Sequence, residues 1–223
     1  LSAIPGTVGA APVQNVGAYG QEIQQVLDSV LAYDLKEEKY VTIKAEDMKL
    51  GYRSSIFNHG EDAGRYLIIS MTIHLSHDTL TPPFYTSLQN YVEEHQITDF
   101  SPKSIREMVT EIRWSKLPKP EEMASSGSFF KNVYLDDAEA DRLRRMNVPV
   151  WEGNKVPSGW LIDHAGLKGM VFHGMRVSEK AALILINESA QSYAHLKQAR
   201  EEIISIIEKK YGLTLKQEPV ELE

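Results

Sequence analysis

A serine, two aromatic residues and a lysine stand together at residues 127–132, which read Gly-Ser-Phe-Phe-Lys-Asn. A serine hydroxyl is a weak acid, so it donates a proton only in special surroundings, such as a dry pocket beside a positive charge. Phe129, Phe130 and Lys131 could provide such surroundings for Ser128. An ordinary serine on a strand is the alternative, and the segment taken alone favours it.

Five cations stand beside predicted structural breaks in a chain whose formal net charge is −7. If their side chains converge, they can bind a multiply charged anion, and the arginines suit a planar carboxylate. If they are scattered, they are ordinary surface charges. The five cations are Arg53, Arg113, Lys116, Lys131 and Lys155.

Glycines near the start of the chain offer a second way to bind an anion. Backbone N–H groups around Gly6, Gly9 and Gly17 can approach a phosphate because no Cβ blocks them. The pattern is neither a Walker loop nor Gly-x-Gly-x-x-Gly, so composition favours two tight turns. At the other end, Glu218 lies in a segment that could fold back into a cleft or remain a solvated tail.

Metal and thiol chemistry find little support in the sequence. His74, His77 and Asp78 suggest a metal site, but their spacing does not suit a strand and no third ligand is obvious. We therefore expect a structural or solvent role for them and no metal. The chain has no cysteine, which excludes disulfides, thiolate ligands and cysteine nucleophiles.

Length and composition narrow the class of protein. The 223 residues allow one large domain or two small ones, and a charged fraction of 25% is typical of soluble proteins. The acidic balance argues against a nucleic-acid-binding protein that relies on positive charge. Its apolar runs are too short to cross a bilayer, and no signal-like segment is evident, so we expect a cytoplasmic protein without membrane insertion. Because the chain begins at Leu1 rather than methionine, we expect the whole protein to be longer.

The elements that must position these residues fall into two parts, with a domain junction predicted near residue 117. In the first part, a polar loop at 36–39 joins two strands as a hairpin, and a third strand alternates from Ile69 on, which predicts one buried face. Ser101 is the expected N-cap of the second helix. The predicted strands are 26–34, 40–44 and 66–75, and the predicted helices are 87–94 and 101–114.

In the second part, the most distinct element is a long helix at 191–211, with apolar residues at helical spacing and Gly212 as its C-cap. The other predicted elements are helices at 136–146 and 156–165 and strands at 170–177, 182–187 and 213–222. This mixture predicts an α+β fold with segregated strands and helices rather than repeated βαβ units.

Taken in order, these motifs resemble the UDP-N-acetylenolpyruvoylglucosamine reductase family, flavin enzymes of bacterial peptidoglycan synthesis. The resemblance covers essentially the whole chain, and the order of six motifs makes it specific. The matching segments are residues 4–20, 51–57, Arg113 with 116–118, 127–132, 159–163 with 166–169, and 215–220.

The resemblance implies a domain plan. Residues 1–117 would be the second subdomain of a two-subdomain FAD-binding domain of the PCMH/vanillyl-alcohol-oxidase-like type, with a tyrosine-bearing substrate loop near 85. Residues 118–212 would be an α+β substrate-binding domain, and 213–223 a terminal strand returning to the active site. Nothing in the sequence matches the family's amino-terminal FAD-binding region.

The resemblance also implies a reaction and the roles of residues. NADPH reduces FAD, which passes a hydride to the enolpyruvyl group of UDP-N-acetylglucosamine enolpyruvate to give UDP-N-acetylmuramate. Arg53 would pair with the substrate carboxylate, Ser128 would donate the proton, and Glu218 would assist the enol intermediate. The implied substrate contacts are Tyr85, Arg113, Lys116, Asn132 and Lys155, with Trp151 near a family tyrosine. The implied FAD contacts are Ile4, Gly6, Gly9, Ala10, Val13, Gln14 and Gly17.

Three positions depart from the family pattern. Val133 and Gln217 stand where proline is usual, and His164 stands where a polar amide is common. By resemblance the whole protein would be a cytoplasmic monomer that serves cell-wall synthesis, cell shape and cell division, with a UDP-sugar and no nucleic acid as partner. The alternative is a UDP-sugar-binding module without redox activity, because half of the flavin site is missing.

Overall fold

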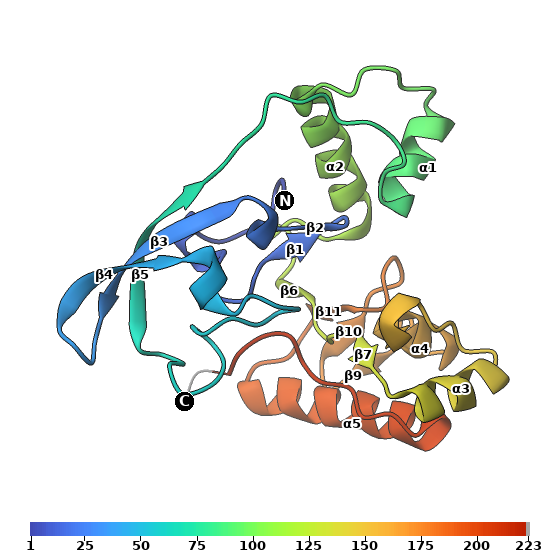
Figure 1. Ribbon diagram of the computed structural model, residues 1–223. Helices are drawn as coiled ribbons and strands as arrows, with labels where there is room; N and C mark the ends of the chain where they lie inside the picture. Colours follow the sequence, from blue (N-terminus) through green and yellow to red (C-terminus); the bar gives the residue numbers. More distant parts are fainter. Residues whose placement is uncertain (222–223) are drawn as a thin grey trace. The chain divides into compact units, whose positions relative to one another are not determined.

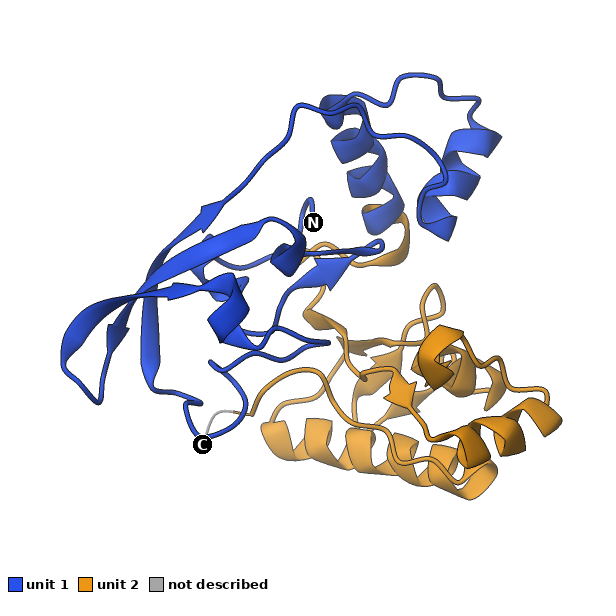
Figure 2. Ribbon diagram, viewed as in Figure 1, with its two compact units in different colours: residues 1–113 blue, residues 114–223 orange. Residues whose placement is uncertain are grey.

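The computed structural model describes residues 1–221, and the chain divides into two compact units after Arg113. Figure 2 colours these units separately. The sequence places the junction near residue 117. The two units divide between Arg113 and Trp114, within the last turn of helix α2 (Pro102–Lys116), which ends two residues beyond the predicted end at Trp114.

The first unit contains a three-stranded antiparallel sheet in the order β4-β3-β5 (Figure 1). Its strands are β3 (Leu27–Asp34), β4 (Lys39–Lys44) and β5 (Tyr66–Ile73). The predicted hairpin between the first two strands is confirmed, with Ser29 opposite Lys44 and Asp34 opposite Lys39. Alternation along β3 buries one face of the sheet in an apolar cluster. The buried β3 residues of this cluster are Leu27, Val30 and Ala32.

The predicted alternation of β5 from Ile69 on is wrong in its phase. The pairing with β3 skips one residue, since Leu31 faces Ser70 but Ala32 faces Ile68. This irregularity lets Ile68 and Met71, three residues apart, both pack against the core. Ile69 is left on the other side, with 55% of its surface exposed.

Two helices form a separate cluster within the first unit, where Figure 1 shows them beside each other. They are α1 (Thr86–Glu94) and α2, close to the predicted ranges. Leu88 and Val92 of α1 pack against the apolar stripe of α2, which includes Met108 and Ile112. The predicted N-cap is confirmed, because the N–H of Ser104 donates to Ser101 Oγ at 3.3 Å.

Short elements precede and connect these larger ones. Strands β1 (Gly17–Ala18) and β2 (Gln21–Glu22) form a small hairpin whose turn contains Tyr19 and Gly20. The 3₁₀ turns of the molecule are Val8–Ala10, Ile23–Gln25, Ala45–Met48 and Glu152–Asn154.

The second unit is built on a four-stranded antiparallel sheet in the order β6-β11-β10-β9. The strands are β6 (Ser125–Ser128), β9 (Val171–Phe172), β10 (Met175–Val177) and β11 (Ile184–Asn187), and β7 (Val133–Tyr134) pairs separately with β8 (Lys155–Val156).

The single strand predicted at 170–177 is instead the hairpin β9–β10. His173 and Gly174 both have positive φ angles, 49° and 82°, as a tight two-residue turn requires. A Cβ on Gly174 would lie 2.6 Å from the backbone nitrogen of Ala190, so glycine is also required by close packing. Because apolar residues stand on both sides of the turn, the hydrophobic pattern predicted one continuous strand.

Three helices complete the second unit: α3 (Asp137–Arg145), α4 (Ser158–His164) and α5 (Tyr193–Tyr211). On α5, Ala199, Ile203 and Ile207 are fully buried in the apolar cluster that also contains sheet residues. Gly212 ends the helix as predicted, with φ of 69° and its N–H bonded to the Glu208 carbonyl at 2.8 Å.

The predicted terminal strand at 213–222 is wrong for the residues that the structure describes, and Leu222 lies outside them. Leu213 and Leu215 are buried, which explains their strand-like alternation. The segment forms only one isolated antiparallel bridge, between Gln217 and Phe130. Pro219 follows two residues after Gln217, and proline cannot donate to a ladder.

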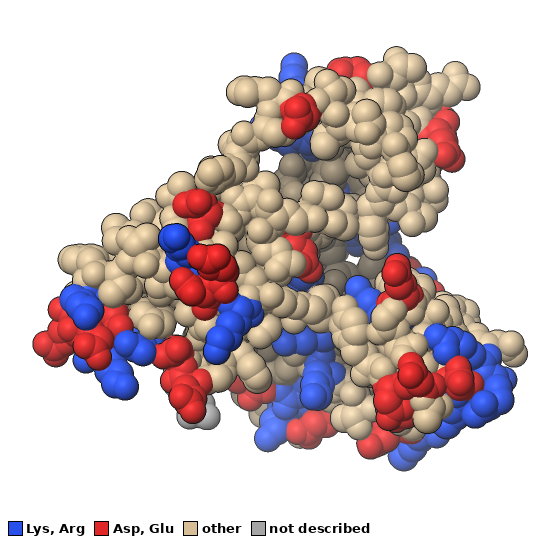
Figure 3. Space-filling model, in the orientation of Figure 1, with Lys and Arg blue, Asp and Glu red and all other residues tan. Residues whose placement is uncertain are grey.

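Charges of both signs mingle on the surface, for example over α3 and at the tip of the β3–β4 hairpin (Figure 3). Within residues 1–221, no helix is long and apolar enough to cross a membrane. In the same range, no three histidine, aspartate or glutamate side chains gather as a metal site would require.

Candidate functional site

In the second unit, the structure brings the segments of Ser128 and Glu218 together. Glu218 donates its backbone N–H to the carbonyl of Phe129 at 2.8 Å, and Phe129 follows Ser128 directly. Lys131 donates its N–H to the carbonyl of Lys216, also at 2.8 Å. The terminal segment therefore runs antiparallel beside residues 129–131. Both Ser128 and Glu218 are half-buried.

The chain around Asn132 is fixed by a serine that sequence reasoning missed. Ser158 is fully buried at the start of α4. It donates its hydroxyl to the carbonyl of Lys131 at 2.6 Å and its N–H to Asn132 Oδ1 at 3.1 Å. Because these bonds join α4 to the segment that follows Ser128, they restrict the backbone of residues 131 and 132.

Lys155 lies between two exposed aromatic rings. Its ammonium nitrogen is 5.8 Å from the ring centre of Tyr134 and 5.7 Å from that of Trp151, within cation–π range. The Trp151 N–H donates to the carbonyl of Lys155 at 2.8 Å, which fixes the turn between them. The cation is therefore held at an accessible place, where it can meet an anion. Lys116, at the end of α2, is exposed.

In the first unit, Arg53 is held against the small β1–β2 hairpin. Its Nη2 donates to the carbonyl of Gly17 at 3.1 Å, and its guanidinium carbon lies 5.2 Å from the ring centre of Tyr52. A Cβ on Gly17 would lie 2.8 Å from Glu22 Cγ and 3.3 Å from Arg53 Nη1. Glycine at 17 therefore allows the arginine to approach the hairpin.

The tip of the same hairpin contacts Tyr85. The rings of Tyr19 and Tyr85 meet edge to face with 6.1 Å between centres, and a Cβ on Gly20 would lie 3.4 Å from Tyr85 Cδ2. Burial raises the pKa of Tyr19, although the neighbouring Arg113 charge opposes the rise. Burial also lowers the pKa of Arg113 from its ordinary value. One hairpin thus joins Arg53, Tyr85 and Arg113.

Two buried polar residues, Asn15 and Ser55, fix the glycine-rich segment. Asn15 is fully buried, and its amide donates to Glu22 Oε2 at 2.8 Å and to the carbonyl of Gly51 at 3.1 Å. Ser55 donates its hydroxyl to the carbonyl of Val13 at 2.5 Å. Buried polar side chains with fully used hydrogen bonds specify one backbone path. Sequence reasoning read Asn15 and Ser55 only as parts of motifs.

The predicted FAD contacts near the start of the chain differ in what they can offer. The N–H groups of Ala10 and Val13 donate to carbonyls within turns, at 3.1 and 3.2 Å. Gly6 has φ of 118°, and a Cβ there would meet no atom within 4 Å. Ile4, Gly9 and Gln14 are half-buried. The segment therefore combines rigid turns with open space beside Gly6.

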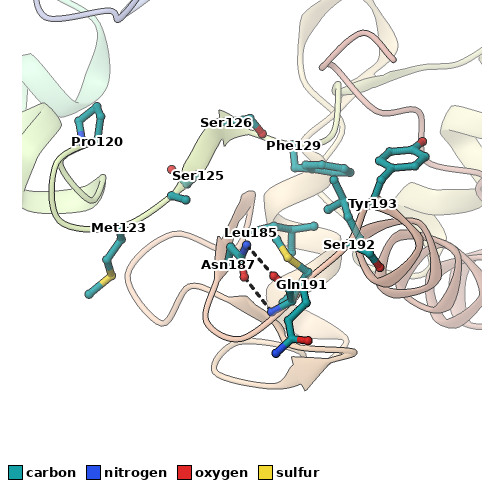
Figure 4. Close-up of a pocket in the computed structure, with 14 residues that line it drawn as sticks. Pro120, Met123, Ser125, Ser126, Phe129, Leu185, Asn187, Gln191, Ser192 and Tyr193 are labelled. Carbon is teal, nitrogen blue, oxygen red and sulfur yellow. Dashed lines mark hydrogen bonds between the residues drawn. The ribbon is translucent and has the colours of Figure 1, made fainter. Parts of the chain in front are cut away.

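A pocket of about 520 Å³ opens in the second unit, beside the Ser128 segment. Figure 4 shows the ring of Tyr193, at the start of α5, on the same side as Phe129. Asn187 is part of the wall, and its side chain bonds to both the N–H and the carbonyl of Ala190. No sequence motif predicts this pocket, because strand, loop and helix each contribute residues to it. Its other linings include Met123, Ser125, Ser126, Met175, Leu185 and Leu196.

The fold has a counterpart among solved structures. It is similar to the UDP-N-acetylenolpyruvylglucosamine reductase of Thermus caldophilus, with a TM-score of 0.59 and 18% sequence identity, over 97% of this chain and 60% of that one. At this identity the likeness concerns the fold alone.

Sequence comparisons agree with this fold. Residues 119–222 match the family model described as UDP-N-acetylenolpyruvoylglucosamine reductase, C-terminal domain. Among relatives of that name, the protein of Ralstonia nicotianae is 36% identical over 99% of this chain and 66% of its own length. That of Neisseria gonorrhoeae is 37% identical over 98% and 65%. The chain belongs to the UDP-N-acetylenolpyruvoylglucosamine reductase family, and it spans just under two thirds of the length of these relatives.

Proposed function

We propose that this chain takes part in the NADPH- and FAD-dependent reduction of UDP-N-acetylglucosamine enolpyruvate to UDP-N-acetylmuramate, in cytoplasmic peptidoglycan synthesis. Family membership supports the proposal, since the relatives are named as reductases. The observation that carries it is the pairing of the Glu218 segment with the backbone beside Ser128. A proton donor and a carboxylate held close together suit a step that adds a proton to carbon.

Ser128 is the proposed proton donor. It lies at the end of β6, opposite Ile184, and the next residue, Phe129, bonds to the carbonyl of Leu183 at 2.8 Å. The hydroxyl is therefore carried by a backbone that is fixed on the sheet side. Glu218 would assist by accepting or relaying a proton as the enol collapses. Positioning by two paired backbone segments costs no reorganisation during the reaction.

Arg53 is the proposed partner of the substrate carboxylate. Reduction of an enolpyruvyl group places negative charge on the adjacent carboxylate, and a guanidinium can meet both of its oxygens. The bond of Nη2 to the Gly17 carbonyl fixes one side of the Arg53 fork. The negative charge on this carboxylate would increase in the transition state. Arg53 would therefore bind the transition state more tightly than the substrate.

Other cations and polar groups are proposed to hold the UDP-sugar. In the second unit these are Lys116, Asn132 and Lys155, and in the first unit Tyr85 and Arg113. Lys155 is supported by its place over exposed aromatic rings, and Arg113 by its partial burial beside Tyr19. A cation with reduced access to water attracts a phosphate more strongly than an exposed one.

The glycine-rich segment fits part of a flavin site. Open space beside Gly6 and the rigid turns through Ala10 and Val13 would allow a flat or phosphorylated group to lie against backbone. We propose that residues 4–17 hold part of FAD, within the two-subdomain arrangement implied for residues 1–117. When bound, FAD supplies the hydride for the reduction. The residues of this chain bind the substrate and deliver the proton.

The direct test follows NADPH oxidation by the protein as its gene encodes it, with FAD and UDP-N-acetylglucosamine enolpyruvate. Ser128→Ala should lower the rate of product formation about a hundredfold, the range of general acid catalysis, while flavin reduction by NADPH stays nearly unchanged. Ser70→Ala, in an exposed strand position, serves as control. Loss of flavin reduction in Ser128→Ala would refute the proposed role, and absence of substrate-dependent oxidation in the unaltered protein would refute the function.

A UDP-sugar-binding module without redox activity is the second candidate. It is favoured by the match of the family model to residues 119–222, which covers only the second unit. Calorimetry on the 223-residue chain separates the two. UDP-sugar binding without FAD binding would support the module, and a flavin absorption spectrum after incubation with FAD would exclude it. Light scattering on the protein as its gene encodes it tests the monomer expected of the whole protein.

A further inference from the structure

The segment that carries Glu218 is joined to residues 129–131 by only a short pairing. Phe130 and Gln217 lie opposite each other, and the bonds Lys131–Lys216 and Glu218–Phe129 stand on either side of them. In an antiparallel pair of this kind, the two opposite residues direct their own N–H and carbonyl groups away from each other. The backbone N–H of Gln217 therefore takes no part in holding Glu218.

The side chain of Gln217 makes the contacts that its backbone does not. Its Oε1 accepts a hydrogen bond from Arg200 Nη1 at 2.5 Å, and its Nε2 donates to the carbonyl of Pro219 at 2.9 Å and to Glu221 Oε1 at 3.1 Å. The residue before Glu218 is thus bonded through its side-chain amide to two residues after Glu218 and to α5. In the sequence, Gln217 is notable only because it stands where proline is usual in the family.

Arg200 is the centre of this network. It lies on α5, one turn before the buried Ile203, and only 14% of its side chain is exposed. It also pairs with Glu221, so it contacts the terminal segment before and after Glu218. Hydrogen bonds from Tyr193 and Arg200 lower the pKa of Glu221, which means that these contacts favour its ionised form. Hydrogen bonds between a largely buried arginine and a carboxylate are stronger than hydrogen bonds between neutral groups.

We propose that Arg200, acting through Gln217 and Glu221, positions Glu218 beside Ser128. These three residues form the Arg200 clamp. The proposal rests on the role of Glu218 in the proposed function. Its physical reason is that the clamp adds to the two backbone bonds: Arg200 on α5 holds Gln217 and Glu221, and Gln217 holds Pro219, so the segment around Glu218 frays less readily. The residues of the clamp are positioning residues that need not touch the substrate.

The first test measures the clamp without any reaction. In Gln217→Ala, hydrogen exchange at the amide of Glu218 should be about tenfold faster, because a lost hydrogen bond to a charged group costs on the order of 1.4 kcal/mol of local stability. Arg200→Met should show the same change. Lys209→Met, an exposed lysine on the same helix, should show none. Unchanged exchange at Glu218 in Gln217→Ala would overturn the proposal.

Proline at position 217 provides a rescue that a merely destabilised variant would not show. Gln217→Pro keeps the two flanking backbone bonds, because the Gln217 N–H is not used, and its ring restricts the backbone. Glu218 exchange should therefore be slower in Gln217→Pro than in Gln217→Ala. In the proline background, Arg200→Met should also have less effect than in the unaltered chain. Equal exchange in the alanine and proline variants would contradict the proposal.

Kinetics on the protein as its gene encodes it, with FAD bound, then connect the clamp to the reaction. Gln217→Ala should lower kcat about tenfold with KM unchanged, as expected for a misplaced group that does not bind the substrate, and Gln217→Pro should restore much of it. Faster exchange with unchanged kcat in Gln217→Ala would overturn the positioning role. If Glu218→Gln itself leaves kcat unchanged, the proposed function of Glu218 is wrong, while the exchange data still judge the clamp separately.

Discussion

In each unit a largely buried arginine binds a carboxylate, Arg65 in the first and Arg200 in the second, and the two arginines hold very different structures. In the first unit, Arg65 meets Asp34 through two bonds, Nε–Oδ1 at 2.9 Å and Nη2–Oδ2 at 2.6 Å. In the second unit, Arg200 meets Gln217 and Glu221. Asp34 ends strand β3, within a continuous ladder of paired residues. Gln217 belongs to a segment with a single isolated bridge.

The difference shows that the effect of losing an ion pair depends on the structure that its segment supports. Asp34 also accepts the N–H groups of Lys36 and Glu37, at 2.9 and 3.2 Å, and so fixes the turn of the central hairpin. Losing Arg65 therefore affects the sheet that forms the core of its unit. Losing Arg200 affects a peripheral segment, and with it the position of Glu218. The first arginine should matter for stability and the second for function.

The largest effect on stability is expected from Arg65→Met. It leaves the Asp34 carboxylate, whose side chain is only 3% exposed, without its ion-pair partner, and such a charge is strongly destabilising. The urea midpoint of the first unit should fall clearly. Amide exchange at β3 and β5 measures the unfolding of this unit. The urea midpoint of Arg65→Lys should lie between those of the unaltered chain and Arg65→Met, because lysine keeps the charge but cannot bind both carboxylate oxygens.

The matched change in the second unit is Arg200→Met, which should leave the urea midpoint nearly unchanged while altering exchange at Glu218. If both arginine variants lower the midpoint equally, the two networks are equivalent and the comparison fails. If Arg65→Met has no effect, the β3–β4 ladder alone is sufficient to hold the hairpin.

Acid should remove the stabilising effect of Arg65. Its hydrogen bonds lower the pKa of Asp34 from 3.8 to about 2. A lowered carboxylate pKa contributes stability that is complete above the unfolded value and lost as pH falls through the folded value. The difference in urea midpoint between the unaltered chain and Arg65→Met should therefore be constant above about pH 5 and shrink towards pH 2. A difference that stays constant over this range would exclude the ion pair as its source.

Local patterns predicted the elements of both units well where one period dominated. The long helix ending at Gly212 and the cap at Ser101 followed from the sequence because each depends on neighbouring residues. The hairpin at His173 was missed because apolar residues flank its turn. In β5, Ile69 was misplaced because the phase of a strand changes at a bulge that its partner strand imposes.

The residues of the candidate site could be named from the sequence, but the contacts between them could not. Motif order identified Ser128 and Glu218, whose segments the structure then joined. Ser158 and Arg200 were missed, since an isolated serine or arginine on a helix carries no signal in one sequence. Their importance arises from burial and from segments 27 and 17 residues away, which local patterns do not report.

The smallest effects are expected at two helix caps, one in each unit. Asp136 accepts the N–H of Glu139 at 2.8 Å, and Ser101 accepts that of Ser104 at 3.3 Å. Replacing an N-cap residue by alanine costs about 1 kcal/mol of stability. The loss is larger for a charged acceptor at a short distance than for a neutral acceptor at a long one. Asp136→Ala should therefore destabilise the chain more than Ser101→Ala, which should cost about 0.5 kcal/mol in urea unfolding.

This last pair tests whether the units differ in strength or only in arrangement. The Asp136 carboxylate also lies at the positive end of the α3 dipole, so salt should weaken its effect and leave that of Ser101 unchanged. Equal losses in the two cap variants, with equal salt dependence, would mean that cap chemistry does not distinguish the units. The contrast between them would then rest on the two arginines, Arg65 in a continuous ladder and Arg200 beside an isolated bridge.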